Sequence, residues 1–348
     1  MVNVMLENKI NNLDYTKFHA DFNINVADIT LGAKVLFASD EFFAPAERII
    51  SPSDPIFVPD LYDENGKWMD GWETRRKRTY GFDYCVIKLA FPCAISKILV
   101  DTTHFTGNAP MGVSLDAIFM QDARDEMQMD QDWVTVLSFN HIESDHKNVF
   151  TIQKPRLATH IKLNIYPDGG VARLRVFGDI VFDEKNVDDN VSNILSLGNG
   201  SKVIACSDNH YGSPINLLKP TAPINMGDGW ETRRRRTPGN DWCIFKLPFR
   251  GYIHHIEIDT THFKGNYPAQ FSVQALGDTN KDQYDASNNL LVYQSTFWPY
   301  IVNVSDLQAN TSKSFDVFDS EISQLYIKLN IYPDGGLARF KVWGTFSV

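Results

Sequence analysis

The sequence predicts an all-β protein made of two jelly-roll β-sandwich repeats in tandem. At 348 residues the chain is longer than a typical single domain, so two domains are expected. Short runs of alternating apolar and polar residues are separated by turn signals, and long helical periodicity is scarce. Long sequence motifs also occur twice in the same order. Strands are predicted at residues 86–92, 95–102, 253–260, 271–276 and 291–297.

The internal duplication is most visible in its charged letters. DGWETRRKRT at 70–79 returns as DGWETRRRRT at 228–237, and DTTHFTGNAP at 101–110 returns as DTTHFKGNYP at 259–268. Two further pairs are IKLNIYPDGGVAR at 161–173 with IKLNIYPDGGLAR at 327–339, and ASDEFFAPAERII at 38–50 with CSDNHYGSPINLL at 206–218. The copy offsets differ by about ten residues between motifs, and insertions of this size belong in loops.

These spacings set the expected domain boundaries. Residues 1–28 are expected to be an N-terminal extension and residues 29–183 the first repeat. An acidic linker is expected at 184–194, followed by the second repeat at 195–348.

The segment 161–177 is predicted to be an antiparallel hairpin. Asp-Gly in PDGG is a favoured hairpin centre, and a register around it pairs Leu163 with Leu174 on the apolar face and Asn164 with Arg173 on the polar face. Gly169 and Gly170 are expected to meet a need for positive φ.

Composition excludes several classes of function. A net charge of −10 argues against nucleic acid and anionic membranes as partners. No secretory signal or membrane-spanning apolar run is visible, and four cysteines are too few for a disulfide scaffold, so a cytoplasmic location is expected. Cys85 and Cys243 are expected to be small buried hydrophobes. No HExxH or CxxC spacing is present, so neither a metal site nor a cofactor is predicted, although a metal assembled from distant residues stays open.

The repeated motifs supply the candidate site residues. In DGWETRR, Glu73 and Arg75 share one side of an extended segment, and Arg75 or Arg76 offers a planar fork for a carboxylate, whereas Lys77 and Arg78 are expected to be solvated. Only His104 and His262, among nine histidines, hold equivalent positions in the two copies. Arg173 and Arg339, near the predicted hairpin tips, are expected to reach a pocket mouth.

At DGWETRR, DTTHF-x-GN and YPDGG-x-AR, each present twice, the chain resembles the allantoicase family. SDEFFAPAE and SDNHYG resemble that family's first motif in each copy, and the resemblance extends from about residue 29 to 346. It implies hydrolysis of allantoate to ureidoglycolate and urea in purine breakdown through allantoin. It also implies an amidinohydrolase acting on non-peptide carbon–nitrogen bonds, and jelly-roll repeats of the galactose-binding-like kind.

The chemistry of allantoate then suggests roles for these residues. A guanidinium clamp would hold the carboxylate, an acid would protonate the departing urea nitrogen, and a base would activate water. In the first repeat Arg75 or Arg76, with Arg173, is assigned to the clamp, His104 to the acid, and Glu73 or Asp70 to the base, while Asn108 binds a ureido group. The equivalent candidates of the second repeat are Asp228, Glu231, Arg233, Arg234, His262, Asn266 and Arg339.

Two other functions and two structural questions stay open at this point. The protein could hydrolyse a related ureido compound, or it could be a non-catalytic tandem carbohydrate-binding protein. The repeated motifs are rich in charge that a neutral sugar does not need, which favours the enzyme. The sequence does not decide between one composite site and one site per repeat, and a homo-oligomer is possible.

Overall fold

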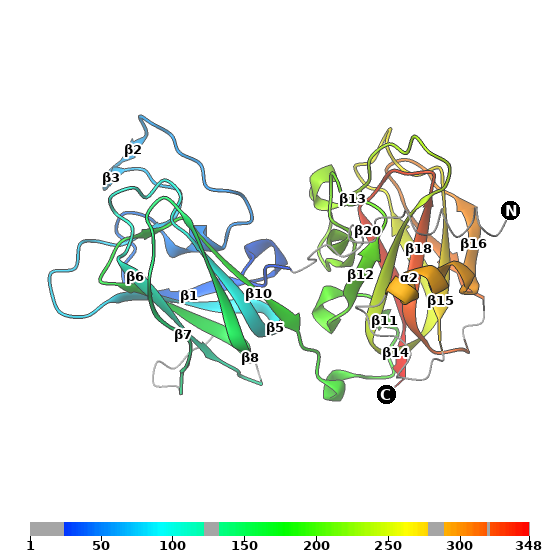
Figure 1. The fold of residues 1–348 in the computed structure, drawn as a ribbon, viewed down its shortest axis with the longest axis horizontal. Helices are drawn as coiled ribbons and strands as arrows, with labels where there is room; N and C mark the ends of the chain where they lie inside the picture. Colours follow the sequence, from blue (N-terminus) through cyan, green and yellow to red (C-terminus); the bar gives the residue numbers. More distant parts are fainter. Residues whose placement is uncertain (1–23, 122–131, 278–288, 319–320, 348) are drawn as a thin grey trace, which may run out of the picture. The chain divides into compact units, whose positions relative to one another are not determined.

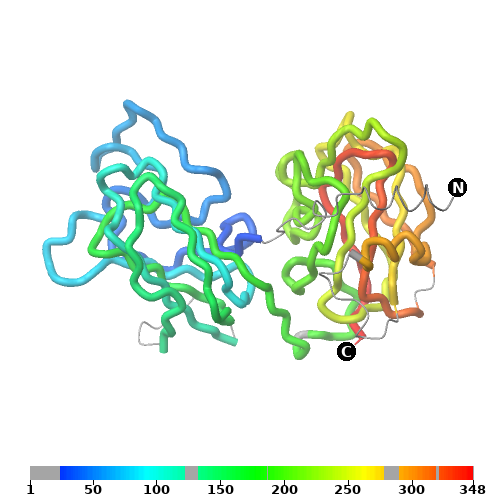
Figure 2. Tube along the Cα trace, in the orientation of Figure 1, coloured from blue at the N-terminus to red at the C-terminus, as the bar shows by residue number. Residues whose placement is uncertain are grey.

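The computed structural model describes residues 24–121, 132–277, 289–318 and 321–347. This part of the chain forms two compact units that divide at Val181 and Phe182. Figure 1 shows strands dominating both units, and Figure 2 shows the blue-to-green part of the chain confined to one unit and the green-to-red part to the other. The predicted tandem β-sandwich is confirmed.

The first unit is organised around two long antiparallel strands, β5 and β8. The first half of β5 pairs with β1 and the second half with β10, so this strand belongs to both layers of the sandwich. The remaining order is β8-β6-β7. The strand bounds are β1 Lys34–Ala38, β5 Asp83–Asp101, β6 Gly112–Ile118, β7 Val134–His141, β8 Lys147–Tyr166 and β10 Arg173–Ile180.

The second unit repeats this arrangement. Its long strand β14 pairs with β12 and β18 through its first half and with β17 and β20 through its second half. β18, β15 and β16 follow in order, and β11 pairs with β20. The bounds are β11 Ser192–Asn193, β12 Lys202–Cys206, β14 Asp241–Asp259, β15 Gln270–Leu276, β16 Tyr300–Asp306, β17 Ser312–Asp316, β18 Gln324–Tyr332 and β20 Arg339–Ser347.

Short elements carry the connections. Two-residue strands are β2 Tyr62–Asp63, β3 Gly66–Lys67, β4 Trp72–Glu73, β9 Gly170–Val171, β13 Trp230–Glu231 and β19 Gly336–Leu337. Short 3₁₀ helices are η2 Ile29–Leu31, η3 Ala46–Ile50, η4 Glu184–Asn186, η5 Leu197–Asn199, η6 Pro214–Leu218, η7 Met226–Asp228 and η8 Ser295–Phe297. None of the helices in the described residues is long and apolar enough to cross a membrane.

The predicted strand at 291–297 is wrong, because this segment forms helix α2 (Asn289–Gln294) and then η8. Leu291 is buried and packs in a cluster with Trp298 and Tyr326. A short apolar run does not distinguish a strand from a buried helical turn, which is why the sequence misled here.

The predicted hairpin at 161–177 is also wrong. β8 pairs with β5 and β6, and β10 pairs with β5, so Leu174 lies opposite Val100 instead of Leu163. The PDGG turn after the cis bond Tyr166–Pro167 leads into β9, where Val171 pairs with Trp72. Alternation shows that a strand has two unlike faces, but it does not show which strand lies beside it.

Gly169 meets the predicted need for positive φ (138°), whereas Gly170 does not. Gly170 is required for a different reason, since a Cβ there would overlap the buried ring of Phe105. The turn therefore approaches the 101–109 segment closely, and Gly170 N donates a 2.7 Å hydrogen bond to Asn108 O.

Both repeats begin earlier than the sequence predicted. Val26 and Ala27 are fully buried in the first core, and Val26 N donates to Val176 O at 2.9 Å, so residues 24–28 belong to the first repeat and not to an extension. Strand β11 and the fully buried Ile194 likewise attach residues 192–194 to the second repeat and not to the linker. Residues 1–23 of the predicted extension lie outside the described residues.

All four cysteines are buried and none forms a disulfide, and burial is as expected for Cys85 and Cys243. Burial raises the pKa of the thiols of both residues. They pack as small apolar side chains.

Two lysines at equivalent strand positions of the repeats, Lys162 and Lys328, face different residues on the neighbouring strand. On equivalent strand positions, Lys162 pairs with Asp116 at 3.1 Å, whereas Lys328 lies opposite Gln274. Lys328 is 6% exposed and its Nζ lies 5.5 Å from the centre of the Trp242 ring. Burial lowers the pKa of Lys328 to about 8.

This depressed pKa predicts a pH-dependent stability difference. Below about pH 8 the folded protein must hold a buried ammonium, which costs up to about 3 kcal/mol, and the cost disappears as pH rises toward the ordinary lysine value. Lys328→Met should therefore be more stable than the unsubstituted protein at pH 7, with the difference shrinking by pH 10. Guanidinium denaturation at both pH values measures the difference. Lys162→Met, which removes the cation paired with Asp116, should instead be destabilising at pH 7.

Candidate functional site

All four repeated motifs contribute residues to one cavity in the first unit. The cavity has a volume of about 710 Å³, within the range of about 300–1,000 Å³ usual for small-molecule sites. Its lining includes Phe43, Glu73, Arg76, Arg78, Asn108 and Asp168. Thr74 N donates to Gly169 O at 3.2 Å and Gly169 N to Thr74 Oγ1 at 3.1 Å, which joins the DGWETRR and YPDGG motifs.

Glu73 and Asn108 form the polar centre of this cavity. Asn108 Nδ2 donates a 2.7 Å hydrogen bond to Glu73 Oε1, while no described residue bonds Asn108 Oδ1. Burial raises the pKa of Glu73, the Asn108 hydrogen bond opposes this rise, and the negative charge of Asp63 adds to it. The predicted site residues Glu73 and Asn108 therefore lie together, with a carboxyl group suited to proton transfer.

The basic run after Glu73 divides into tethered and untethered side chains. Arg75 Nη2 lies 2.6 Å from Asp40 Oδ2, and Lys77 Nζ lies 2.6 Å from Asp83 Oδ1. Arg76 and Arg78 are exposed and have no hydrogen-bond or ion-pair partner in the described part of the chain. Of the two arginines predicted as the clamp, the structure leaves Arg76 available, while Arg75 is held by Asp40.

Arg173 and Asp70 do not act as predicted, because each is occupied by the other. Arg173 is only 2% exposed, and its Nη2 donates to Asp70 Oδ2 at 2.7 Å. Its other hydrogens go to backbone carbonyls, including Ser53 O at 2.8 Å and Asp70 O at 2.9 Å. Asp70 Oδ2 also accepts from Ile56 N at 2.9 Å. The pair braces the loop before β4, and the prediction that Arg173 reaches a pocket mouth is wrong.

The second repeat contains the same brace. Arg339 is 1% exposed and donates to Asp228 Oδ2 at 2.7 Å, so its predicted position at a pocket mouth is wrong for the same reason. Asp228 additionally pairs with Lys219 at 2.6 Å. Burial alone would raise the pKa of Asp228, but the hydrogen bonds from Lys219 and Arg339 hold it below its ordinary value. Neither Asp70 nor Asp228 is thus available as the predicted base.

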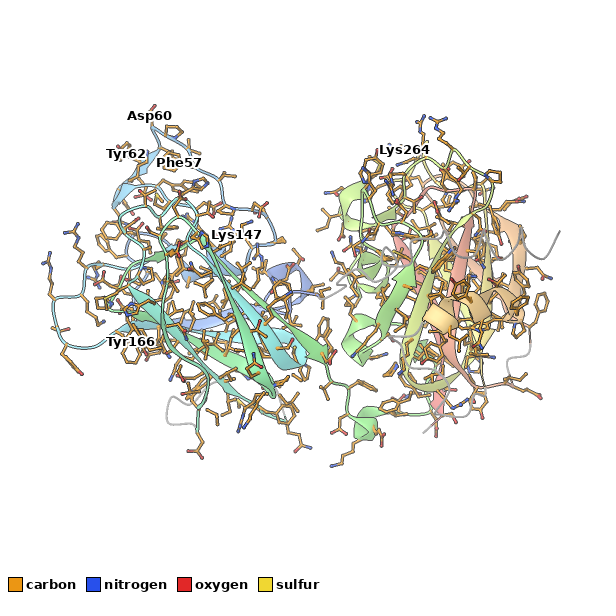
Figure 3. All side chains as sticks on the ribbon, in the orientation of Figure 1. Phe57, Asp60, Tyr62, Lys147, Tyr166 and Lys264 are labelled. Carbon is orange, nitrogen blue, oxygen red and sulfur yellow. The ribbon has the colours of Figure 1, made fainter. Side chains whose placement is uncertain are left out.

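The two recurring histidines occupy different surroundings. His104 does not line the first cavity. Its ring lies 5.6 Å from the ring of Phe57, a residue of the segment inserted before DGWETRR (Phe57 is labelled in Figure 3). His262 lines a cavity of the second unit, and its Nε2 lies 3.0 Å from Pro223 O. Both residues have positive φ, 71° and 74°, a conformation in which histidine is enriched. This backbone requirement gives a structural reason for the recurrence.

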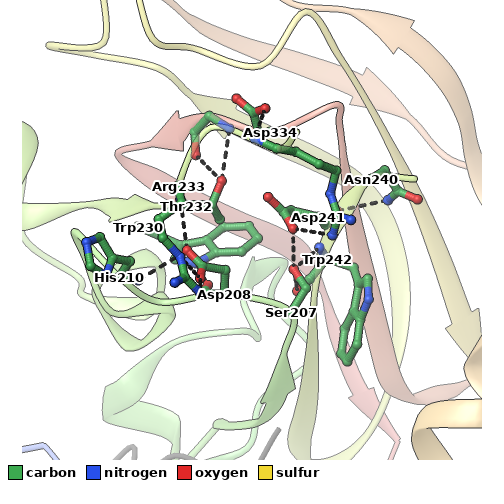
Figure 4. A network of polar contacts seen from close by, with 12 residues as sticks. Ser207, Asp208, His210, Trp230, Thr232, Arg233, Asn240, Asp241, Trp242 and Asp334 are labelled. Atoms are coloured by element: carbon green, nitrogen blue, oxygen red, sulfur yellow. Dashed lines mark hydrogen bonds and ion pairs between the residues drawn. The ribbon is translucent and has the colours of Figure 1, made fainter. Parts of the chain in front are cut away.

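The second unit has its own cavity of about 660 Å³, lined by Asn225, Met226, Arg234, His262, Lys264, Gly265 and Asn266. Asn266 Nδ2 donates to Glu231 Oε1 at 2.7 Å, as in the first repeat. Arg233 is tethered to Asp208 at 2.6 Å (Figure 4). Arg235 is tethered to Asp241 at 2.8 Å. Arg234 is the untethered arginine of this cavity, and each of the two cavities is lined by residues of one repeat.

Sequence reasoning missed several residues of the cavities. Arg78 was expected to be solvated, yet it lines the first cavity with Arg76, two positions away, as the period of an extended chain allows. The sequence predicts only a turn at Asp168, but its Oδ2 accepts a hydrogen bond from Lys77 N at 2.8 Å and the residue lines the cavity. Lys264 occupies one of the few positions of its motif that differ between the two copies, and this difference is the sequence signal for its place in the cavity.

No group of three or more histidine, cysteine, aspartate or glutamate side chains within the described ranges is arranged to hold a metal ion. The absence of a metal or cofactor stays a prediction.

The sequence and fold of the chain are similar to those of known proteins. The family model "Allantoicase repeat" matches residues 24–181 and 192–347. A probable allantoicase of Acinetobacter baylyi is 44% identical over 92% of this chain and 93% of its own, and probable allantoicase 1 of Burkholderia mallei is 42% identical over 93% and 95%. The crystal structure of allantoicase from Saccharomyces cerevisiae is similar with a TM-score of 0.76 and 31% identity, covering 97% of each chain. The chain belongs to the allantoicase family.

Proposed function

We propose that the protein hydrolyses allantoate to ureidoglycolate and urea in the breakdown of purines through allantoin, and that the cavity of the first repeat is the active site. The observation that carries the proposal is the presence, in one cavity, of a carboxyl group with a raised pKa and two untethered guanidinium groups. Membership of the allantoicase family supports the choice of substrate. In terms of reaction class, the protein is an amidinohydrolase acting on a non-peptide carbon–nitrogen bond.

The cavity's chemistry matches the parts of the substrate. Allantoate is a small carboxylate whose central carbon carries two ureido nitrogens. Arg76 and Arg78 offer charge-assisted hydrogen bonds to the carboxylate. Asn108 Oδ1 can accept from a ureido N–H while Asn108 Nδ2 stays on Glu73.

Glu73 serves as the proton carrier. One ureido nitrogen leaves as urea, helped by the lone pair of the other, and water adds to the central carbon. Glu73 takes the proton that water loses and supplies the proton that the urea nitrogen gains, so the group returns to its starting state in each turnover. Asn108 orients the carboxyl group through the 2.7 Å hydrogen bond.

The four buried cysteines form no disulfide, which fits a reducing compartment, and the cytosol is the proposed location. A homo-oligomer remains a proposal to be checked by light scattering.

Removing the clamp tests the substrate assignment. Arg76→Ala should raise KM for allantoate by about 10–100-fold, because a hydrogen bond to a charged group contributes about 1.5–3 kcal/mol. Arg76→Lys keeps the positive charge but loses the planar guanidinium, so its KM should lie between those of the unsubstituted protein and Arg76→Ala. Urea released from allantoate provides the assay. An unchanged KM in Arg76→Ala would remove Arg76 from the site, and no urea release by the unsubstituted protein would refute the proposed function.

A further inference from the structure

The two cavities share the groups that would recognise a ureido acid. Each has an untethered arginine at the equivalent position, Arg76 or Arg234, and an asparagine, Asn108 or Asn266, whose amide nitrogen is held by a glutamate at 2.7 Å. As with Asn108, no described residue bonds Asn266 Oδ1. An arginine for a carboxylate and an amide oxygen for ureido N–H groups are thus present twice.

The cavities differ in the groups that would do chemistry. Glu73 and Asp168 line the first cavity, whereas none of the described residues lining the second is an aspartate or glutamate. The second cavity instead contains Lys264, which stands where the first repeat has Thr106, on the loop between β14 and β15 (Figure 3). Among the described residues, the second cavity is therefore lined by the cations Arg234 and Lys264 and by no carboxyl group, and Nε2 of its one imidazole, His262, is engaged by Pro223 O at 3.0 Å.

The surroundings of the two cavities also differ, because the first repeat has about ten extra residues between positions 50 and 70. In the first repeat the inserted segment brings Phe57 against His104. It also carries Asp63, whose charge adds to the rise that burial causes in the pKa of Glu73. The second repeat lacks these ten residues, so His262 lines the cavity and Met226 takes the position of Trp68. The repeats have kept a recognition site in common and diverged around it.

We propose that the cavity of the second repeat is a non-hydrolytic binding site for a small ureido carboxylate, the chemical class of the substrate and of the ureidoglycolate product. Arg234 and Lys264 bind the carboxylate and Asn266 Oδ1 accepts from the ureido group. This inference rests on the proposed function, because the ligand class is that of the proposed reaction.

Calorimetric titration of the full chain with N-carbamoylglycine tests the proposal. This probe has a carboxylate and one ureido group but lacks the second ureido group that assists urea departure. We expect two equivalents bound per chain, with one lost in Arg234→Ala/Lys264→Thr and the other in Arg76→Ala/Arg78→Ala. Acetate and urea, each offering half of the probe, should bind the second site at least tenfold more weakly. Acetate binding as tightly as the probe would overturn the ureido assignment.

The remaining outcomes separate this inference from the proposed function. One equivalent, lost only in Arg76→Ala/Arg78→Ala, would overturn the second site and leave the first intact. One equivalent, lost only in Arg234→Ala/Lys264→Thr, would instead remove the proposed active site. Glu73→Gln tests the absence of hydrolysis, since a variant that kept about half of the urea release would show that the second cavity is catalytic.

Discussion

Glu73→Gln is expected to lower kcat for urea release from allantoate by about 10²–10⁴-fold, the usual contribution of a positioned acid–base group. Glutamine has nearly the same shape and can still accept from Asn108 Nδ2, so binding should change much less than kcat. The effect should therefore appear in kcat, while KM stays within a few-fold. Steady-state kinetics with a urea assay measures both constants.

The equivalent substitution Glu231→Gln is the matched variant. Glu231 does not line the second cavity. A loss of hydrolysis confined to Glu231→Gln would therefore contradict the assignment to Glu73 and move the active site to the second repeat. Equal partial losses in both variants would indicate two working sites. Full activity in Glu73→Gln would show that Glu73 is not the proton carrier.

Arg173→Met is expected to destabilise the first repeat by about 3–5 kcal/mol, the usual cost of removing one partner of a buried ion pair. Without the guanidinium, the Asp70 carboxylate, only 15% exposed, loses its cation, and the carbonyls of Ser53 and Asp70 lose a donor. Guanidinium denaturation followed by tryptophan fluorescence measures the change, and Asp70→Asn in the Arg173→Met background should recover part of it.

The second repeat again provides the control. Arg339→Met should cost less than Arg173→Met, because Asp228 keeps Lys219 at 2.6 Å. Equal losses would show that the backbone hydrogen bonds of the arginine, and not its charge, stabilise the brace. A change below 1 kcal/mol in Arg173→Met would contradict the brace itself.

The sequence by itself determined the duplication, the all-β class and the motifs that form the site. Duplicated letters at nearly constant offset require two similar folds, and alternation along short segments requires half-buried strands. The sequence alone identifies Glu73, Arg76 and Asn108 as candidates, since their chemistry is visible in the residue types.

Only the tertiary structure decided which of these groups face a common cavity. Arg173 and Arg76 are both arginines within repeated motifs, yet one is buried against Asp70 and the other lines the cavity without a partner. The choice depends on which strand lies beside which: β9 pairs with β4 and β10 with β5, where the alternating pattern predicted a hairpin. Side-chain patterning specifies the faces of a strand, but the partner of a strand is set by packing of distant segments, and that packing selects the residues of the site.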